Sequence, residues 1–109
     1  NSKDVKEVLE SLTPYKYEIN VPQSFIAVVE AFGSKKADVA AMNSFGYIVA
    51  NQKYGAEAKL TVIRFGSPTY KGQIITRSKD NLKDLKSLAG KKFAFVDPAS
   101  TSGYLLPLK

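Results

Sequence analysis

The sequence predicts an α/β fold in which helices flank a partly parallel sheet. Apolar residues recur every three or four positions in some segments and alternate or cluster in others, and the two kinds of segment follow one another along the chain. With 109 residues, 44% of them hydrophobic, the chain has room for one ordinary domain with its own core. Such an alternation is typical of helices that cover the faces of a mainly parallel sheet.

Four segments have the patterns of helices. The first, over residues 5–12, places its valines and leucines on one face and must end before Pro14. The other three are predicted from an N-cap at Ser24 to Gly33, from an N-cap at Asn43 or Ser44 to Gly55, and over residues 80–88 before Gly90.

Five segments are predicted to be strands: residues 15–21, 37–42, 60–65, 73–77 and 92–96. The first alternates aromatic and β-branched residues with polar ones, a period of two that suits a half-buried strand. The second is a short apolar run, which is typical of a strand buried on both faces. The last leads directly into residues 97–103, a loop rich in helix-capping residues.

The residue inventory excludes most familiar catalytic sites. The chain has no Cys and no His, so thiolate nucleophiles, Ser-His triads, zinc sites and haem ligation lack their essential groups, and we expect neither a metal nor a cofactor. The net charge is +6, but the lysines stand singly or in two adjacent pairs, which favours a solvated surface over a nucleic-acid site. No apolar run reaches the length of a membrane span.

Residues 97–103 are the leading candidate site. In an α/β sheet, ligands bind beyond the carboxyl ends of the strands, where a loop that follows a strand lies. Ser100, Thr101 and Ser102 are three consecutive hydroxyl donors, and the first turn of a following helix would add unpaired N–H groups. Together these groups suit a tetrahedral oxyanion. They also suit an ordinary capped turn, and composition alone leaves both interpretations open.

Three segments resemble the phosphate, phosphite and phosphonate binding proteins of ABC transporters. The sequence DPASTSG at 97–103 is the most specific of them, and ADVA at 37–40 and GSPTY at 66–70 occur in the same order as in that family. The resemblance covers residues 17–107 and implies the type 2 periplasmic binding fold. The chain would then be a single partial lobe, residues 1–109, with the second lobe absent from it.

The resemblance implies ligand-binding roles for individual residues. The hydroxyls of Ser100, Thr101 and Ser102 would hold the oxyanion head group. Tyr70, the tyrosine after GSP, would line the cleft, although an aromatic residue of a strand is equally well explained by burial.

One position departs from the family pattern. Phe25 occupies the place of a ligand-contacting tyrosine in the phosphonate binders, and phenylalanine lacks the hydroxyl. This difference argues against specificity for aminoalkylphosphonates and leaves inorganic phosphate, phosphite and other alkylphosphonates open as ligands. Ser24 and Ser44, at two predicted helix starts, are further donors or simple caps.

The implied function is that of a non-enzymatic solute receptor for an ABC importer. Its partners would be a phosphorus oxyanion and the transporter permease, outside the cytoplasmic membrane, with the permease or a lipid anchor as its link to that membrane. A lobe without its counterpart is expected to bind the anion poorly, because the ligand would stay half in water. Two alternatives are a phosphate-cradling enzyme fragment, although no P-loop is present, and a basic nucleic-acid-binding module, although the lysines are scattered.

Overall fold

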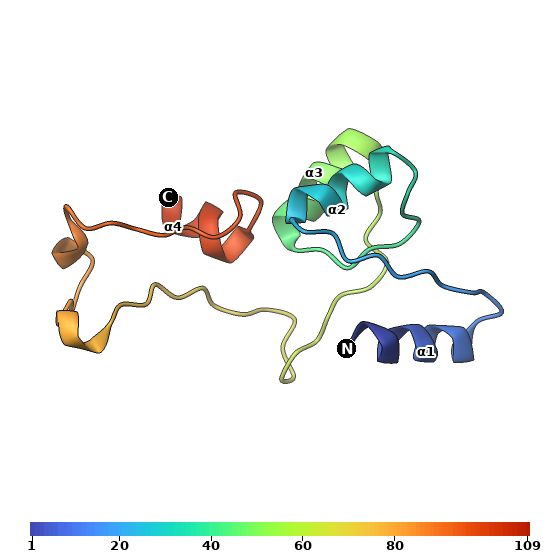
Figure 1. Ribbon diagram of the computed structural model, residues 1–109, viewed down its shortest axis with the longest axis horizontal. Helices are drawn as coiled ribbons and strands as arrows, with labels where there is room; N and C mark the ends of the chain where they lie inside the picture. Colours follow the sequence, from blue (N-terminus) through green and yellow to red (C-terminus); the bar gives the residue numbers. More distant parts are fainter.

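Helices α2 and α3 form the packed centre of the structure. In this computed structural model, which describes residues 1–109, α2 spans Phe25–Gly33, α3 spans Ser44–Tyr54, and the two lie side by side (Figure 1). Val29 of α2 lies against Gly46 of α3, and both are buried, as is Ala50 one turn further on. Because residues 46 and 50 are small, α2 can approach α3 closely.

The ends of these helices lie where the sequence predicts them. The Ser24 hydroxyl accepts a hydrogen bond from the Ala27 N–H at 3.2 Å, and the Asn43 Oδ1 accepts one from the Gly46 N–H at 2.7 Å. Gly55 ends α3 with a left-handed φ of 69°, a conformation that glycine adopts without steric cost. The predictions of both helices are therefore confirmed.

The N-terminal helix is also confirmed but stands apart. Helix α1 spans Ser2–Leu12, and the Asn1 side chain caps it by accepting from the N–H groups of Lys3 and Asp4. Figure 1 shows α1 on an arm of its own, away from α2 and α3. Its apolar residues Val5 and Val8 remain exposed, so amphipathic spacing and a capping box are enough to define this helix without packing.

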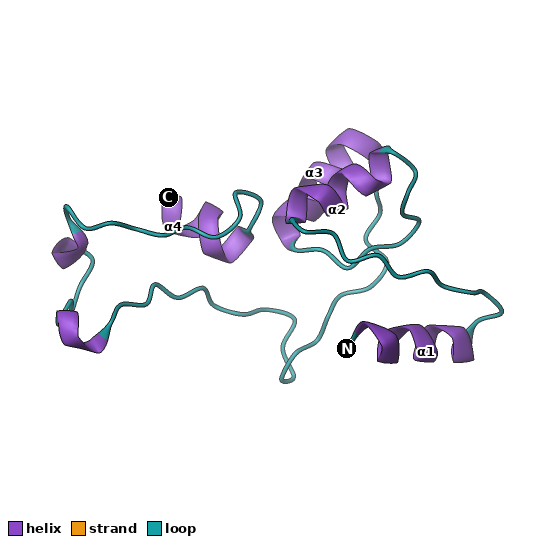
Figure 2. Cartoon of the chain, in the orientation of Figure 1, coloured by secondary structure: helices purple, strands orange, loops and turns teal.

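The structure does not contain the predicted parallel sheet. No strand is present (Figure 2), and the only β-type pairing is an isolated antiparallel bridge between Arg64 and Ser67. The five segments predicted as strands, residues 15–21, 37–42, 60–65, 73–77 and 92–96, run without strand partners.

The physical reason is that a sequence period does not supply a partner. Alternation fixes which side chains share a face, whereas a ladder needs a second backbone about 4.8 Å away to pair with. No layer covers these segments here, and Val39, Leu60 and Ile75 are 79%, 95% and 86% exposed.

The predicted helix over residues 80–88 is replaced by two short 3₁₀ turns, η1 (Ser78–Asp80) and η2 (Lys86–Leu88). Asn81 adopts a left-handed φ of 49° and ends the first turn. Asp84 and Ser87 then bond to each other's backbone: the Ser87 N–H donates to Asp84 Oδ1 at 2.8 Å and the Ser87 hydroxyl to the Asp84 carbonyl at 2.6 Å. These side-chain bonds take the place of helical hydrogen bonds.

The C-terminal segment turns back toward the helix pair. A π-helical turn, η3 (Thr101–Leu105), is followed by α4 (Leu106–Leu108), and the Val96 N–H donates to the Gly103 carbonyl at 3.0 Å. A Cβ atom at residue 103 would lie 2.5 Å from Val96 Cγ2, so only glycine fits there. The ring of Tyr104 packs on Phe95, with centroids 5.1 Å apart.

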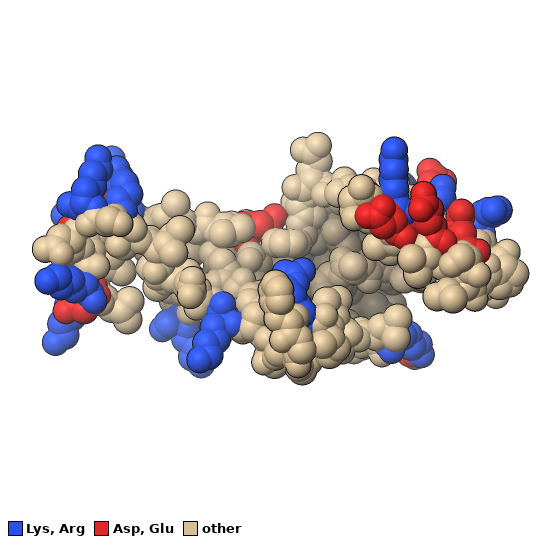
Figure 3. Space-filling view, turned by 90° about the horizontal axis from the view of Figure 1, so that it is seen from below, with Lys and Arg blue, Asp and Glu red and all other residues tan.

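The molecule is elongated, with principal extents of 55 × 30 × 22 Å and a radius of gyration of 17.7 Å. A compact domain of about this length has a radius near 13 Å. Lys and Arg side chains gather at the end that carries η1 and η2, while acidic side chains and lysines lie together at the α1 end (Figure 3). Residues 77–92 hold six basic residues and two aspartates, a net charge of +4. No helix combines the length and the apolar character needed to cross a lipid bilayer.

Candidate functional site

The three consecutive hydroxyl residues lie beside the N-terminus of α3. Ser100 is 6% exposed, and Thr101 and Ser102 are half-buried at the start of η3. The Ser100 hydroxyl accepts a hydrogen bond from the Gly103 N–H at 3.1 Å, and the Ser100 carbonyl accepts one from the Leu105 N–H at 3.0 Å. Ser100 therefore caps and shapes the turn.

Thr101 connects this turn to α3. Its hydroxyl oxygen accepts a hydrogen bond from the Phe45 N–H at 3.0 Å. The first N–H groups of a helix have no partner within the helix, and this bond satisfies one of them. Thr101 thus acts as a cap supplied from 56 positions away in the sequence.

Ser102 is paired with Tyr70. The Tyr70 hydroxyl donates a hydrogen bond to Ser102 Oγ at 3.0 Å, although the Tyr70 side chain is otherwise 74% exposed. The backbone at Gly72 passes so close that a Cβ atom there would lie 3.3 Å from the Ser102 carbonyl oxygen. The GSPTY segment and the residues after it are therefore held against the hydroxyl turn. Two parts of the chain that were predicted separately as site segments thus lie together.

Two polar side chains that had no individual ligand-binding role in the sequence-based prediction, Asn43 and Asp97, fix the loop ahead of the turn. Asn43 Nδ2 donates to the Ala99 carbonyl at 3.0 Å, in addition to its capping bond within α3. Asp97 accepts from the Ala99 N–H at 2.8 Å and from the Phe25 N–H at 3.4 Å, so its carboxylate lies at the N-terminus of α2. The capping preference of Asn and Asp was visible in the sequence, but the long-range partners were not.

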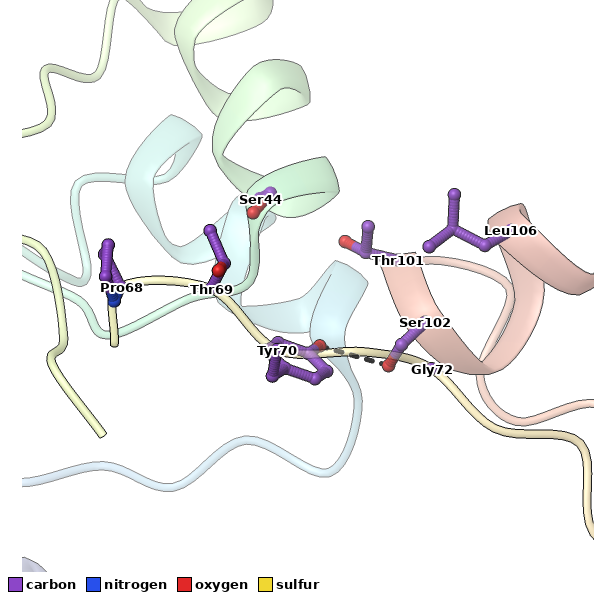
Figure 4. Close-up of a pocket in the computed structure, with 8 residues that line it drawn as sticks. All are labelled: Ser44, Pro68, Thr69, Tyr70, Gly72, Thr101, Ser102 and Leu106. Atoms are coloured by element: carbon purple, nitrogen blue, oxygen red, sulfur yellow. Dashed lines mark hydrogen bonds between the residues drawn. The ribbon is translucent and has the colours of Figure 1, made fainter. Parts of the chain in front are cut away.

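A cleft of about 170 Å³ opens beside these groups. Figure 4 shows Tyr70 pointing toward Ser102, with Ser44, at the start of α3, across from Thr101. None of the residues that line the cleft is charged: Ser44, Pro68, Thr69, Tyr70, Gly72, Thr101, Ser102 and Leu106. The cleft can therefore offer hydroxyl groups and dipoles to a ligand but no formal charge.

The structure places the predicted site residues in two groups. Tyr70, Thr101 and Ser102 line the cleft together with Ser44, one of the two weaker candidates. Ser100 is buried and does not line the cleft. Phe25 does not line the cleft; its backbone N–H meets Asp97 and its side chain is 40% exposed. Ser24, the other weaker candidate, caps α2.

The titratable groups with shifted pKa values lie away from the cleft. The Tyr54 hydroxyl donates to Glu30 Oε2 at 2.7 Å, which holds the pKa of the Glu30 carboxyl below its ordinary value and raises the pKa of Tyr54. Lys53, 3.5 Å from Glu30 Oε1, lowers the Glu30 pKa further. Glu10 of α1 accepts a hydrogen bond from the Tyr17 N–H, which lowers the Glu10 pKa. The Tyr54–Glu30 bond links α3 to α2, the Tyr17–Glu10 bond links α1 to the segment after it, and neither involves a residue that lines the cleft.

Comparison with known proteins gives a family and curated relatives. Residues 2–109 match the family described as "ABC transporter, phosphonate, periplasmic substrate-binding protein". The phosphate-import protein PhnD of Mycolicibacterium smegmatis is 35% identical over 118 aligned positions, which cover 98% of this chain and 37% of the relative. The chain thus spans little more than a third of the length of that curated relative. No solved structure matches the chain.

Proposed function

The chain belongs to the family of periplasmic substrate-binding proteins of phosphonate ABC transporters, and from this premise we propose that it captures a phosphorus oxyanion for import. The family is one of transport proteins rather than enzymes and is consistent with an α/β class. The relative from Mycolicibacterium smegmatis is named for phosphate import, which supports phosphate as well as phosphonate as a ligand. The partners would be that anion and an ABC transporter permease, and the place of action would be outside the cytoplasmic membrane.

The observation that carries the proposal is the set of hydroxyls at the turn of residues 100–102. Thr101 and Ser102 line an uncharged cleft, and Tyr70 and Ser44 add two more hydroxyls to its wall. A hydroxyl that gives its proton to an oxyanion forms a charge-assisted hydrogen bond, which is about twice as strong as a neutral one. We place the anion against Thr101 and Ser102, with Ser100 holding the turn in shape.

The start of α3 supports the same position. This helix of eleven residues begins at Ser44, which lines the cleft, and the positive end of a helix favours an anion. The hydroxyl turn itself continues into only a three-residue helix, so its own dipole contributes little.

Removal of the three hydroxyls tests the site. In the intact protein, replacing Ser100, Thr101 and Ser102 with Ala should weaken phosphate and methylphosphonate binding by several kcal/mol, at about 1.5–3 kcal/mol for each hydrogen bond to a charged partner. A control with Ser11→Ala and Ser34→Ala removes hydroxyls that bond only to their own helices. Calorimetric titration with equal affinity in the triple variant and the control would remove the site assignment.

A further inference from the structure

Residues 77–92 form a basic surface whose acidic residues are already engaged. Arg77 Nε donates to Asp80 Oδ2 at 2.7 Å, and Asp84 Oδ1 accepts a hydrogen bond from the Ser87 N–H at 2.8 Å. The lysines of this surface are all exposed, and none of them is ion-paired: Lys79, Lys83, Lys86, Lys91 and Lys92. The net charge of this surface is therefore displayed by ammonium groups that have no partner.

The basic surface occupies one end of the long axis of the molecule. Figure 1 shows η1 and η2 at that end, and Figure 3 shows the basic side chains gathered there. None of residues 77–92 lines the cleft. A partner that covers the basic surface would therefore leave the cleft free to take up a ligand.

Apolar side chains are exposed within the basic surface and next to it. Leu85, between Lys83 and Lys86, is 72% exposed, and Phe93, directly after Lys92, is exposed as well. Apolar groups flanked by lysines suit the boundary of a lipid bilayer, where the charges meet the headgroups and the apolar groups reach the acyl chains. The combination therefore favours a lipid surface over a purely ionic partner.

Lysine rather than arginine supplies the unpaired charge. An ammonium group is a compact point charge on a flexible stem, whereas the guanidinium fork of arginine makes bidentate contacts of fixed shape. The single arginine of the surface, Arg77, is held by Asp80. Point charges of this kind suit anionic groups that are numerous and not fixed in position, as lipid headgroups are.

From these observations, we propose that residues 77–92 dock the protein on a lipid bilayer that contains anionic headgroups. The unpaired lysines lie against the headgroups, and Leu85 enters the interface between them. Each lysine near an anionic bilayer strengthens binding by about fivefold. The inference goes beyond the proposed function and does not depend on which ligand the cleft takes.

Sedimentation of the full chain with lipid vesicles tests the charges. Vesicles of phosphatidylcholine with about one-third phosphatidylglycerol should carry the protein down, whereas vesicles of phosphatidylcholine alone should not. A variant that neutralises part of the basic surface should bind about a hundredfold more weakly, at about fivefold per lysine: Lys83→Gln, Lys86→Gln and Lys91→Gln.

A matched control has the same net charge as this variant but an intact basic surface. It neutralises three exposed lysines elsewhere that have no ion-pair partner: Lys3→Gln, Lys16→Gln and Lys36→Gln. Charges farther from the bilayer than a Debye length are screened, so the control should bind within about twofold of the unchanged chain.

A fluorescent reporter tests the place of Leu85. The chain has no tryptophan, so a single one introduced by substitution reports on its own position alone. With phosphatidylglycerol vesicles, the emission of Leu85→Trp should shift to the blue and be quenched by brominated acyl chains. Leu12→Trp changes a residue of α1 that is 77% exposed, and it should show neither effect.

Several results would overturn the inference: equal sedimentation with the two kinds of vesicle, equal loss in the two lysine variants, or equal quenching at residues 12 and 85. Binding to bacterial membranes that is abolished by protease treatment of those membranes, without binding to protein-free vesicles, would overturn it too, because the partner would then be an acidic protein. Phosphate binding is measured separately by calorimetric titration, so failure of the membrane inference and failure of the proposed function are distinguishable.

Discussion

The N–H of Phe45 donates a hydrogen bond to the hydroxyl of Thr101, 3.0 Å away and 56 positions later in the chain. This bond makes one residue serve two elements, because Thr101 begins the hydroxyl turn and also completes the start of α3. A helix that opens the cleft and a loop that lines it are thereby fixed relative to each other.

Substitution of Thr101 should separate these two effects. Thr101→Val keeps the shape but leaves the Phe45 N–H without an acceptor, at a cost of about 1–3 kcal/mol. We expect faster exchange of the Phe45 amide hydrogen in Thr101→Val and nearly unchanged exchange in Thr101→Ser, which keeps the hydroxyl. Amide exchange followed by NMR measures both, and equal protection in the two variants would show that the bond contributes nothing.

Asn43 should matter to the loop as well as to its helix. Asn43→Ala removes the cap of α3, which costs about 1 kcal/mol, and also the bond to the Ala99 carbonyl. Asn43→Asp keeps a capping oxygen but replaces the donor to that carbonyl with a negative charge. We therefore expect circular dichroism to show helix loss for Asn43→Ala only, while both variants weaken phosphate binding. Unchanged phosphate binding by Asn43→Asp would show that the bond from Asn43 to the Ala99 carbonyl does not hold the loop in place.

The bond between Glu30 and Tyr54 should make the packing of α2 on α3 depend on pH. Because the Glu30 pKa is lowered in the folded state, its contribution is present at neutral pH and is lost as the pH falls through the folded-state value, below 4.5. Because the Tyr54 pKa is raised, its contribution is present below the ordinary value of 10.0 and is lost as the pH rises above it. NMR titration of Glu30 should show its pKa rise in Tyr54→Phe.

Gly33 provides a second way to break the same bond. A Cβ atom at residue 33 would clash with the Tyr54 ring, so Gly33→Ala must displace that ring. The Glu30 pKa should then rise as it does in Tyr54→Phe. An unchanged Glu30 titration in both variants would mean that Tyr54 does not set this pKa.

Salt should act on capture more than on release. No lysine or arginine lines the cleft, whereas residues 77–92 carry a net charge of +4. Distant charges steer an anion toward the protein and are screened by salt, with a Debye length of about 8 Å at physiological ionic strength. Stopped-flow measurements should show slower phosphate association at higher salt and a nearly constant dissociation rate. A dissociation rate that climbs steeply with salt would place a cation on the ligand.

The sequence predicted well what local chemistry decides. The ends of α1, α2 and α3 follow from Pro14, from the capping residues Ser24 and Asn43, and from Gly55, since each acts on its own neighbours. The helix prediction for residues 80–88 was wrong because the leucine spacing does not reveal the bonds between Asp84 and Ser87, which compete with a helix. The strand predictions were wrong because strand pairing depends on segments that are distant in the sequence.

The site was predictable to the same degree. Hydroxyls at residues 100–102 and the tyrosine at residue 70 could be singled out by residue type and by family resemblance. The roles of Asn43 and Asp97 could not, because each depends on a partner more than 50 positions away. The same holds for the burial of Ser100, which follows from the way the turn folds back on itself.

The bonds that tie residues 43–45 to residues 99–101 also set the order in which the chain can fold. They close a loop of 56 residues, and the chain entropy lost in closing it costs on the order of 4 kcal/mol. A helix closes no such loop and forms in about a microsecond. Helices α1, α2 and α3 should thus form early, and the cleft should form last and open first. A single protease cut in residues 56–69, which cross the surface without helix or strand, would turn loop closure into association of two pieces and make the cleft depend on concentration.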